Sequence, residues 1–302
     1  ARIRRNYLHS RLPVAHMGAS ADLTYPVEYL GDDVGQLEKI ASGKHKFAKI
    51  LKKAKRPMII MGMGALRRAD GSAIHALGYQ IAEQVGAVSK DWNGFNMLHL
   101  AASRVAGLDM GFVPQKGGKD VAGIRKAAAK GEIKLVWLHG ADEMDMADFA
   151  NSFVVYVGHH GDAGAQAADI ILPAAAYTEK DGIYVNFEGR VQMGARAVFP
   201  PGEAREDWAI IRALSERAGC SIGFDTLDAL RSALIEAVPH LAELDAPASE
   251  KWAKFGRAGK LLDQPLTSAL SSYHMSCAIS RSSETMAACH LAAQSDVLDA
   301  AE

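Results

Sequence analysis

The segment from Gly158 to Gly194 holds the residues of this chain whose types and spacing could best do chemistry. It reads GHHGDAGAQAADIILPAAAYTEKDGIYVNFEGRVQMG, and it opens with His159, His160 and Asp162 among glycines. Imidazole and carboxylate groups are good ligands for divalent metals. Adjacent residues of an extended chain point to opposite faces, however, so one ion would rarely take both histidines. The pattern therefore favours a tight loop at a strand end, and we predict no metal site here.

The same segment carries the carboxylates Glu179, Asp181 and Glu188, with Arg190 close by. Paired carboxylates can do acid/base chemistry. Their setting among glycines, beside a cation, is also typical of a hydrogen-bonded turn, and we favour the turn. No serine stands in a G-x-S-x-G setting. We predict no catalytic residue in this chain.

Two other motifs allow a functional interpretation. Gly62 and Gly64 follow an apolar run, as at the start of a dinucleotide-binding fingerprint, but Arg67 stands where the third glycine belongs. This pattern favours a tight turn over a nucleotide site. The basic run from Lys44 to Arg56 could dock an acidic partner, although its spacing favours the solvated face of an amphipathic helix.

Composition limits the function classes. The chain has 302 residues, 49% of them hydrophobic, with a formal net charge of −1, which argues against general binding to nucleic acid. Its three cysteines, Cys220, Cys277 and Cys289, are far apart and predict neither a disulfide framework nor a ligated cluster. No run of eighteen apolar residues predicts a membrane span. Because the chain begins with Ala1, we expect a further N-terminal portion.

The elements that position these residues are predicted from short apolar runs and helical spacing. Strands are expected at 58–61, 133–138, 153–157 and 169–172, and helices at 34–55, from Ser72 to Gly86, at 121–130 and at 207–218. Their alternation predicts an α/β fold with a doubly wound, mainly parallel sheet. We place this domain at residues 1–221. Residues 222–302, interrupted by Pro239, Pro247 and Pro265, are expected to form a helical and loop-rich extension.

Several motifs in fixed order resemble a known family. The strand Asp169 to Pro173, the turn Glu179 to Gly182 and the turn Asn186 to Arg190 resemble the molybdopterin oxidoreductase superfamily. The segment Gly158 to Asp162 is similar to the corresponding segment in one branch of this superfamily, the large iron–sulfur subunit of respiratory complex I. That similarity extends to other segments in the same order: Ala21 to Gly31, Ala54 to Pro57, Pro200 to Trp208 and Ile279 to Ser282.

The resemblance implies a part of NADH:quinone oxidoreductase that lies in its peripheral arm. It implies a scaffold without a cofactor of its own, which supports electron transfer from NADH to quinone. The 4Fe-4S and 2Fe-2S clusters of that large subunit are expected in an N-terminal region outside this sequence. The partners implied are the flavin/NADH-binding subunit and the iron–sulfur subunits of the arm. The place implied is the cytoplasmic side of a bacterial inner membrane, or the matrix side of the mitochondrial one.

This chain departs from the family in its tail. Cys277 and Ala278 stand where relatives often have Asn or Asp followed by Pro, and nothing after His290 resembles the family. The docking of the C-terminus is therefore left open.

Two alternatives remain at this point. The chain could be a molybdopterin-dependent oxidoreductase with a bound molybdenum cofactor, held by the loop from Ala168 to Gln192. The resemblance then implies a set of cofactor-binding residues: His159, His160, Asp162, Glu179, Asn186 and Arg190. The other alternative is a free-standing nucleotide-binding domain built around Gly62 and Gly64.

Overall fold

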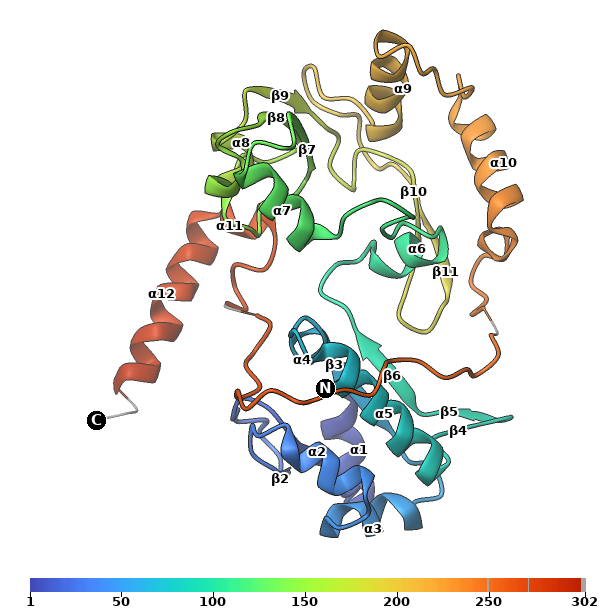
Figure 1. Cartoon of the computed structure of the whole chain (residues 1–302), viewed down its shortest axis with the longest axis vertical. Helices are drawn as coiled ribbons and strands as arrows, with labels where there is room; N and C mark the ends of the chain where they lie inside the picture. The colour runs from blue at the N-terminus through green and yellow to red at the C-terminus, as the bar shows by residue number, and fades with distance from the viewer. Residues whose placement is uncertain (249, 271, 300–302) are drawn as a thin grey trace. The chain divides into compact units, whose positions relative to one another are not determined.

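A computed structural model describes residues 1–248, 250–270 and 272–299 of the chain (Figure 1). The chain forms two compact units. The first comprises Ala1–Ala101 and Ser249–Ser271, and the second comprises Ala102–Ala248 and Ser272–Glu302. The chain thus leaves the first unit, builds most of the second, and returns to the first before its last segment.

The first unit is built around a parallel strand pair with a helical crossover. Strand β3 (Ile59–Gly62) pairs in parallel with β6 (Phe95–Leu98), and α5 (Gly71–Val85) lies between them in sequence. The remaining elements are α1 (Arg2–Ser10), β1 (Ala15–His16), β2 (Glu28–Tyr29), α2 (Gly35–Ala41), α3 (Lys46–Lys53), α4 (Met63–Leu66), β4 (Val88–Ser89) and β5 (Trp92–Asn93). This is the strand, turn and helix unit that the apolar run at 58–61 predicted.

Helix α5 packs closely against β3. A Cβ atom at Gly78 would lie 2.4 Å from the sulfur of Met61, so a larger residue here would force that side chain to move. Ile74 and Ile81 of its buried stripe are 2% and 4% exposed. The helix ends at Gly86, whose φ of 64° is the left-handed conformation that glycine adopts easily. The end of this helix was predicted correctly from the sequence.

Two predicted helix boundaries were wrong. The helix predicted from Ser72 begins earlier, at Gly71, because Asp70 is its N-cap and the carbonyl of Asp70 accepts from the backbone N–H groups of Ala73 and Ile74. The helix expected at 34–55 is two helices, α2 and α3. Gly43 breaks it with a φ of 72°, and the imidazole of His45 then caps α3 by accepting from the backbone N–H of Phe47 at 3.1 Å.

The second unit contains a parallel sheet of three strands. Its order is β7 (Leu135–His139), β8 (Phe153–Gly158) and β9 (Ile170–Pro173). The connections carry η1 (Met146–Phe149) and α8 (Ala163–Gln166). The other elements are α6 (Arg104–Asp109), α7 (Val121–Ala129), the antiparallel pair β10 (Gly182–Val185) and β11 (Val191–Gly194), α9 (Asp207–Arg217), α10 (Leu227–Ala237), η2 (Pro239–Ala242), α11 (Ala278–Arg281) and α12 (Glu284–Asp299).

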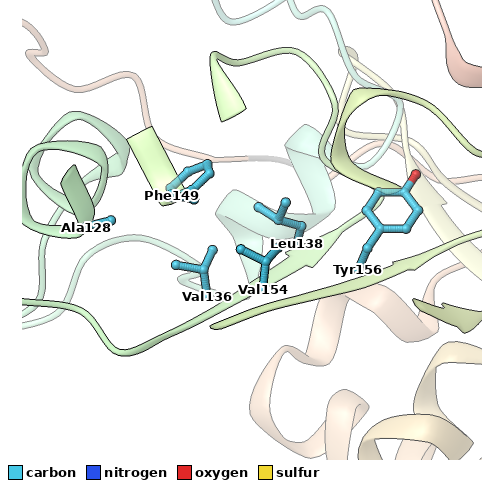
Figure 2. Packing of buried hydrophobic residues seen from close by; sticks show 6 residues of the cluster. All are labelled: Ala128, Val136, Leu138, Phe149, Val154 and Tyr156. Carbon is cyan, nitrogen blue, oxygen red and sulfur yellow. The ribbon is translucent and has the colours of Figure 1, made fainter. Parts of the chain in front are cut away.

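Side chains pack on both faces of strands β7 and β8. On one face, side chains of β7 and β8 pack against α7 and η1, as Figure 2 shows: Val136, Leu138, Val154 and Tyr156 face Ala128 and Phe149. On the other face, Val155 and Val157 pack with Ile210 of α9. Strands buried on two sides need apolar residues at successive positions, which is why the sequence shows continuous apolar runs here.

The fold is mixed α/β with small, mostly parallel sheets. All four strands expected from the sequence are present, and the helices expected at 121–130 and 207–218 match α7 and α9. The expectation of one sheet is not met among the described residues, since β3 pairs with β6 and not with the strands of the second unit. The division at residues 221 and 222 stays a prediction. No helix in the described ranges has both the length and the apolar character needed to cross a bilayer.

A buried ion pair fastens the returning segment, residues 250–270, to the first unit; we call this segment the strap. The carboxylate of Asp70, whose side chain is 1% exposed, accepts from Nε and Nη2 of Arg68 and from the backbone N–H of Leu262. Nη1 of Arg68 donates to the carbonyls of Gln264 and Pro265 at 2.9 and 2.8 Å. The hydrogen bonds from Arg68 lower the pKa of Asp70 to about 2 although burial opposes the shift.

We expect this ion pair to make the chain sensitive to acid. Since folding lowers the pKa of Asp70, its contribution is present above about pH 4 and is lost as the pH falls toward 2. From that shift we expect a loss of about 2 kcal/mol in the free energy of unfolding. In urea unfolding between pH 5 and 2, the wild type should lose about 2 kcal/mol more than Asp70→Asn.

The control is Asp263→Asn, which changes an exposed carboxylate of the strap. It should keep the acid sensitivity of the wild type. An equal pH dependence in all three proteins would contradict the assignment.

Candidate functional site

The candidate site lies at the carboxyl ends of β7, β8 and β9. These ends place His139, then Gly158 with His159 and His160, and Pro173 at one edge of the sheet. Ligands of open α/β sheets usually bind outside this edge. The predicted histidine loop does therefore lie where a functional site would be expected.

An ionised carboxylate is the centre of this edge. Asp207, the first residue of α9, accepts from Nε2 of His139 at 2.8 Å with one oxygen and pairs with Nζ of Lys180 through the other. Trp137 donates to Nδ1 of the same imidazole at 3.2 Å, which assigns the ring proton to Nε2. Burial by itself would raise the pKa of Asp207, but the donors His139 and Lys180 outweigh it and lower the pKa to about 2.

The two predicted histidines face each other. The Nδ1 atoms of His159 and His160 are 2.6 Å apart, and the rings meet edge to face. Burial lowers the pKa of His159, and the charges of His160 and Lys180 lower it further. Because the two Nδ1 atoms contact each other, they cannot both bind one ion placed between the two rings.

Asp162 forms an ion pair with the C-terminal part of the chain. Its Oδ1 accepts from the backbone N–H of Ala163 at 2.8 Å and so caps α8, while its Oδ2 pairs with Nε of Arg281 in α11. Nη2 of Arg281 also contacts Glu143 at 3.1 Å. The segment Ile279 to Ser282, which the sequence singled out, thus supplies the cation that neutralises the predicted Asp162.

A buried carboxylate stabilises the loops beside the histidines. Asp142, 7% exposed, accepts from the backbone N–H of Gly164 at 2.9 Å and lies 3.0 Å from the hydroxyl of Tyr156. That hydroxyl is also 3.1 Å from the carbonyl of His160. Burial and the neighbouring Asp142 raise the pKa of Tyr156, so the hydroxyl stays protonated and donates.

The remaining predicted residues form turns. Glu179 accepts from the backbone N–H of Ala176 at 2.9 Å. The side-chain oxygen of Asn186 accepts from the backbone N–H groups of Glu188 and Arg190 at 2.9 and 3.1 Å, which closes the turn between β10 and β11. The guanidinium of Arg190 pairs with Glu188 and donates to the carbonyl of Asp245. These groups are bonded locally and do not converge with the histidines on one point.

Sequence reasoning missed several residues of this edge: Trp137, His139, Asp142, Tyr156, Asp207 and Arg281. His139 could have been found, because it ends a predicted parallel strand. Trp137 contacts His139 two residues along the same strand. Asp142, Tyr156, Asp207 and Arg281 depend on pairings across 14 to 119 residues, for which the sequence gives no signal.

Comparison with known proteins decides the family. Residues 1–217 match the family model described as molybdopterin oxidoreductase, and residues 241–289 match the one for the C-terminal part of the G subunit of NADH-ubiquinone oxidoreductase. The chain belongs to the molybdopterin oxidoreductase family. The first match covers more than half of its length, and the second follows it in the order that the resemblance predicted.

Individual relatives show which proteins of this family the chain is similar to. The chain is 42% identical over 290 residues to the G subunit of NADH-quinone oxidoreductase from Rickettsia felis, covering 96% of this chain and 41% of the relative. It is 39% identical over 291 residues to the NADH-ubiquinone oxidoreductase 75 kDa subunit from Reclinomonas americana, covering 95% of this chain and 42% of the relative. The chain thus spans about two fifths of these relatives. The predicted resemblance to the large iron–sulfur subunit is confirmed.

The family implies a molybdenum cofactor bound to a pterin, and the side chains of this edge can be tested against it. Asp162, Glu179, Asn186 and Arg190 already bond to partners inside the chain, and the two histidines contact each other. Among the described residues no three His, Cys, Asp or Glu side chains are grouped as a metal site requires. These donors do not fit the cofactor, so we derive no chemical step through it.

We expect Lys180 to stabilise the edge through Asp207. Lys180→Met removes one of two donors to a carboxylate that is 22% exposed, and should raise the pKa of Asp207 and lower the free energy of unfolding by about 1–2 kcal/mol. Urea unfolding at pH 7 measures this loss. Lys126→Met, at an exposed position of α7, is the matched control and should change it little. Equal effects of the two variants would contradict this assignment.

Tyr156→Phe should destabilise the second unit. The change removes the hydroxyl near Asp142 and keeps the ring in the core (Figure 2), so one oxygen of a buried carboxylate loses its donor. We expect a loss of about 1–3 kcal/mol in urea unfolding. Tyr177→Phe, at a residue 63% exposed, provides the control and should have no measurable effect.

Proposed function

We propose that this chain acts as a scaffold without a cofactor within the large iron–sulfur subunit of NADH:quinone oxidoreductase, respiratory complex I. In this proposal it lies in the peripheral arm and supports electron transfer from NADH to quinone without carrying electrons itself. The similarity to that large subunit along nearly the whole chain supports the assignment. The carboxyl edge of the β7–β9 sheet supports the scaffold role.

The observation that carries the scaffold role is that the polar groups of this edge are paired with one another. Asp207 is matched by His139 and Lys180, and Asp162 by Arg281. A ligand would have to break these pairs, and leaving a partly buried charge without its partner costs several kcal/mol. Such groups stabilise loops well and bind ligands poorly.

The electron path is proposed to lie outside this chain. Cys220, Cys277 and Cys289 are free and exposed, and they are not grouped with other ligands in the described ranges. The 4Fe-4S and 2Fe-2S clusters expected from the resemblance would be held by other parts of the complex. The partners would be the flavin/NADH-binding subunit and the iron–sulfur subunits of the arm, on the cytoplasmic side of a bacterial inner membrane or the matrix side of a mitochondrial one.

The finer fold description belongs to the same proposal. We assign residues 1–221 to a doubly wound domain of the molybdopterin oxidoreductase type and residues 222–302 to a helical and irregular extension. The parallel sheets with helices on their faces support the first assignment. The absence of strands among the described residues after 222 supports the second.

The competing function is a molybdopterin-dependent oxidoreductase, in which His159, His160, Asp162, Glu179, Asn186 and Arg190 would hold the cofactor. Metal analysis and pterin fluorescence of the purified full-length protein separate the two. The scaffold proposal expects no stoichiometric molybdenum and copurification with the flavin and quinone-site subunits. Stoichiometric molybdenum together with pterin would overturn it.

A double variant tests the role of the histidines in the assembled complex. His159→Ala with His160→Ala should leave the rate of NADH:quinone oxidoreduction per bound flavin unchanged, because neither imidazole is proposed to take part in electron transfer. The amount of complex assembled is measured separately by flavin content. A fall in the rate per flavin, with assembly intact, would contradict the scaffold role.

A further inference from the structure

Two hollows in the first unit lie side by side on α5. The larger, of about 670 Å³, lies between α5 and the strap and is lined by Ala76, Tyr79, Gln80, Glu83, Gln84, Lys254, Gly256, Arg257 and Ala258. The smaller, of about 500 Å³, lies between α5 and the helices α2 and α3. Gln80 and Gln84 line both hollows, so the two form one surface that crosses the helix.

The wall formed by the strap is fixed against α5. Trp252 and Phe255 pack on Tyr79 with ring centroids 5.5 and 5.1 Å away, and the indole N–H of Trp252 donates to Glu83. At Gly256, where φ is 71°, a Cβ atom would lie 2.3 Å from the backbone nitrogen of Ala76. This close approach requires glycine. It also fixes the backbone beside Lys254 and Arg257, which stand before and after Gly256 in the sequence. This wall is therefore preorganised.

Cations border the surface on both sides. Lys254 and Arg257 line the larger hollow, and Lys49 and Lys52 of α3 line the smaller one. All four are exposed, and none of their own side chains forms an ion pair or a hydrogen bond with another residue that the structure describes. Glu83 is the acidic residue of the lining, and it already accepts from Trp252. The lining thus holds four positively charged side chains and one carboxylate, so most of its positive charge is not balanced by acidic residues of the lining.

The lining between the cations suits a polypeptide. The side chain of Gln84 makes no hydrogen bond to another residue in the part of the chain that the structure describes, and a carboxamide can donate to a peptide carbonyl and accept from a peptide N–H. The exposed face of α5 from Ala76 to Gln84 is about 12 Å long, which matches about four residues of extended chain. Phosphate binding usually draws on backbone N–H groups at a helix N-terminus, and the larger hollow is lined by the middle of α5 and by the strap, not by a helix N-terminus.

We propose that this surface docks an acidic, extended segment of a partner protein, whose carboxylates pair with Lys254 and Arg257 on one side and with Lys49 and Lys52 on the other. The basic run from Lys44 to Arg56 thereby gains a role beyond that of a solvated helix face. The proposal does not depend on the function proposed above, because it concerns binding by this chain alone.

A fluorescein-labelled octaglutamate peptide is the probe for this surface, with fluorescence anisotropy at low salt as the readout. The wild-type chain should bind it, and added salt should weaken the binding because exposed charges are screened. Lys254→Ala with Arg257→Ala, and separately Lys49→Ala with Lys52→Ala, should each weaken it about tenfold, which corresponds to about 1.4 kcal/mol. The four-site variant should weaken it further.

The matched control changes two cations of the same strap that line neither hollow. Lys251→Ala with Lys260→Ala removes the same charge and should keep most of the affinity. Circular dichroism checks that each variant is folded. A further control, Lys116→Ala with Lys119→Ala, removes two positive charges from the second unit.

Three outcomes would overturn the proposal. One is no binding of the peptide by the wild type at low salt. Another is an equal loss of affinity in the strap control and in the variants of the hollows. The last is tighter binding of labelled octathymidylate than of the peptide, lost in the same variants, which would assign the surface to nucleic acid.

Discussion

A carboxylate taken out of water must be matched by donors, and this requirement organises both units. In the first unit the match is Asp70 with Arg68 and the backbone of the strap. In the second it is Asp207 with His139 and Lys180, and Asp142 with Tyr156 and Gly164. In each case the carboxylate joins segments that are distant in sequence. Removing one partner would leave the other buried and unsatisfied, so the pairs hold loops in place.

The same requirement governs the stretch of the chain in which the histidines and carboxylates gather. Histidines, carboxylates and a lysine meet at the carboxyl edge of a parallel sheet, where a ligand would be expected. A binding or catalytic group needs a free lone pair or proton directed at its ligand. Here Lys180 is directed at Asp207, Asp162 is directed at Arg281, and the two imidazoles are directed at each other.

The strap connects the buried ion pair of the first unit to its exposed surface. Its return to that unit depends on the Arg68–Asp70 pair and on the aromatic contacts of Trp252 and Phe255. Those same contacts form one wall of the hollow over α5 and place Lys254 and Arg257 beside it. The strap lies within residues 241–289, which match the C-terminal family model, so that segment completes this surface.

The sequence by itself determined four of the strands, several of the helices and the family. Continuous apolar runs specified β3, β7, β8 and β9. In β8 the reason is that a strand covered on both faces needs apolar residues at successive positions. Gly86, Gly131 and Gly219 marked helix ends, since each adopts a positive φ. Only the tertiary structure decided which charges meet. His139 pairs with Asp207 across 68 residues, Arg281 with Asp162 across 119, and Arg68 with the carbonyl of Gln264 across 196. A charge can pair with any opposite charge that the fold brings near, and its sequence neighbours do not specify which one.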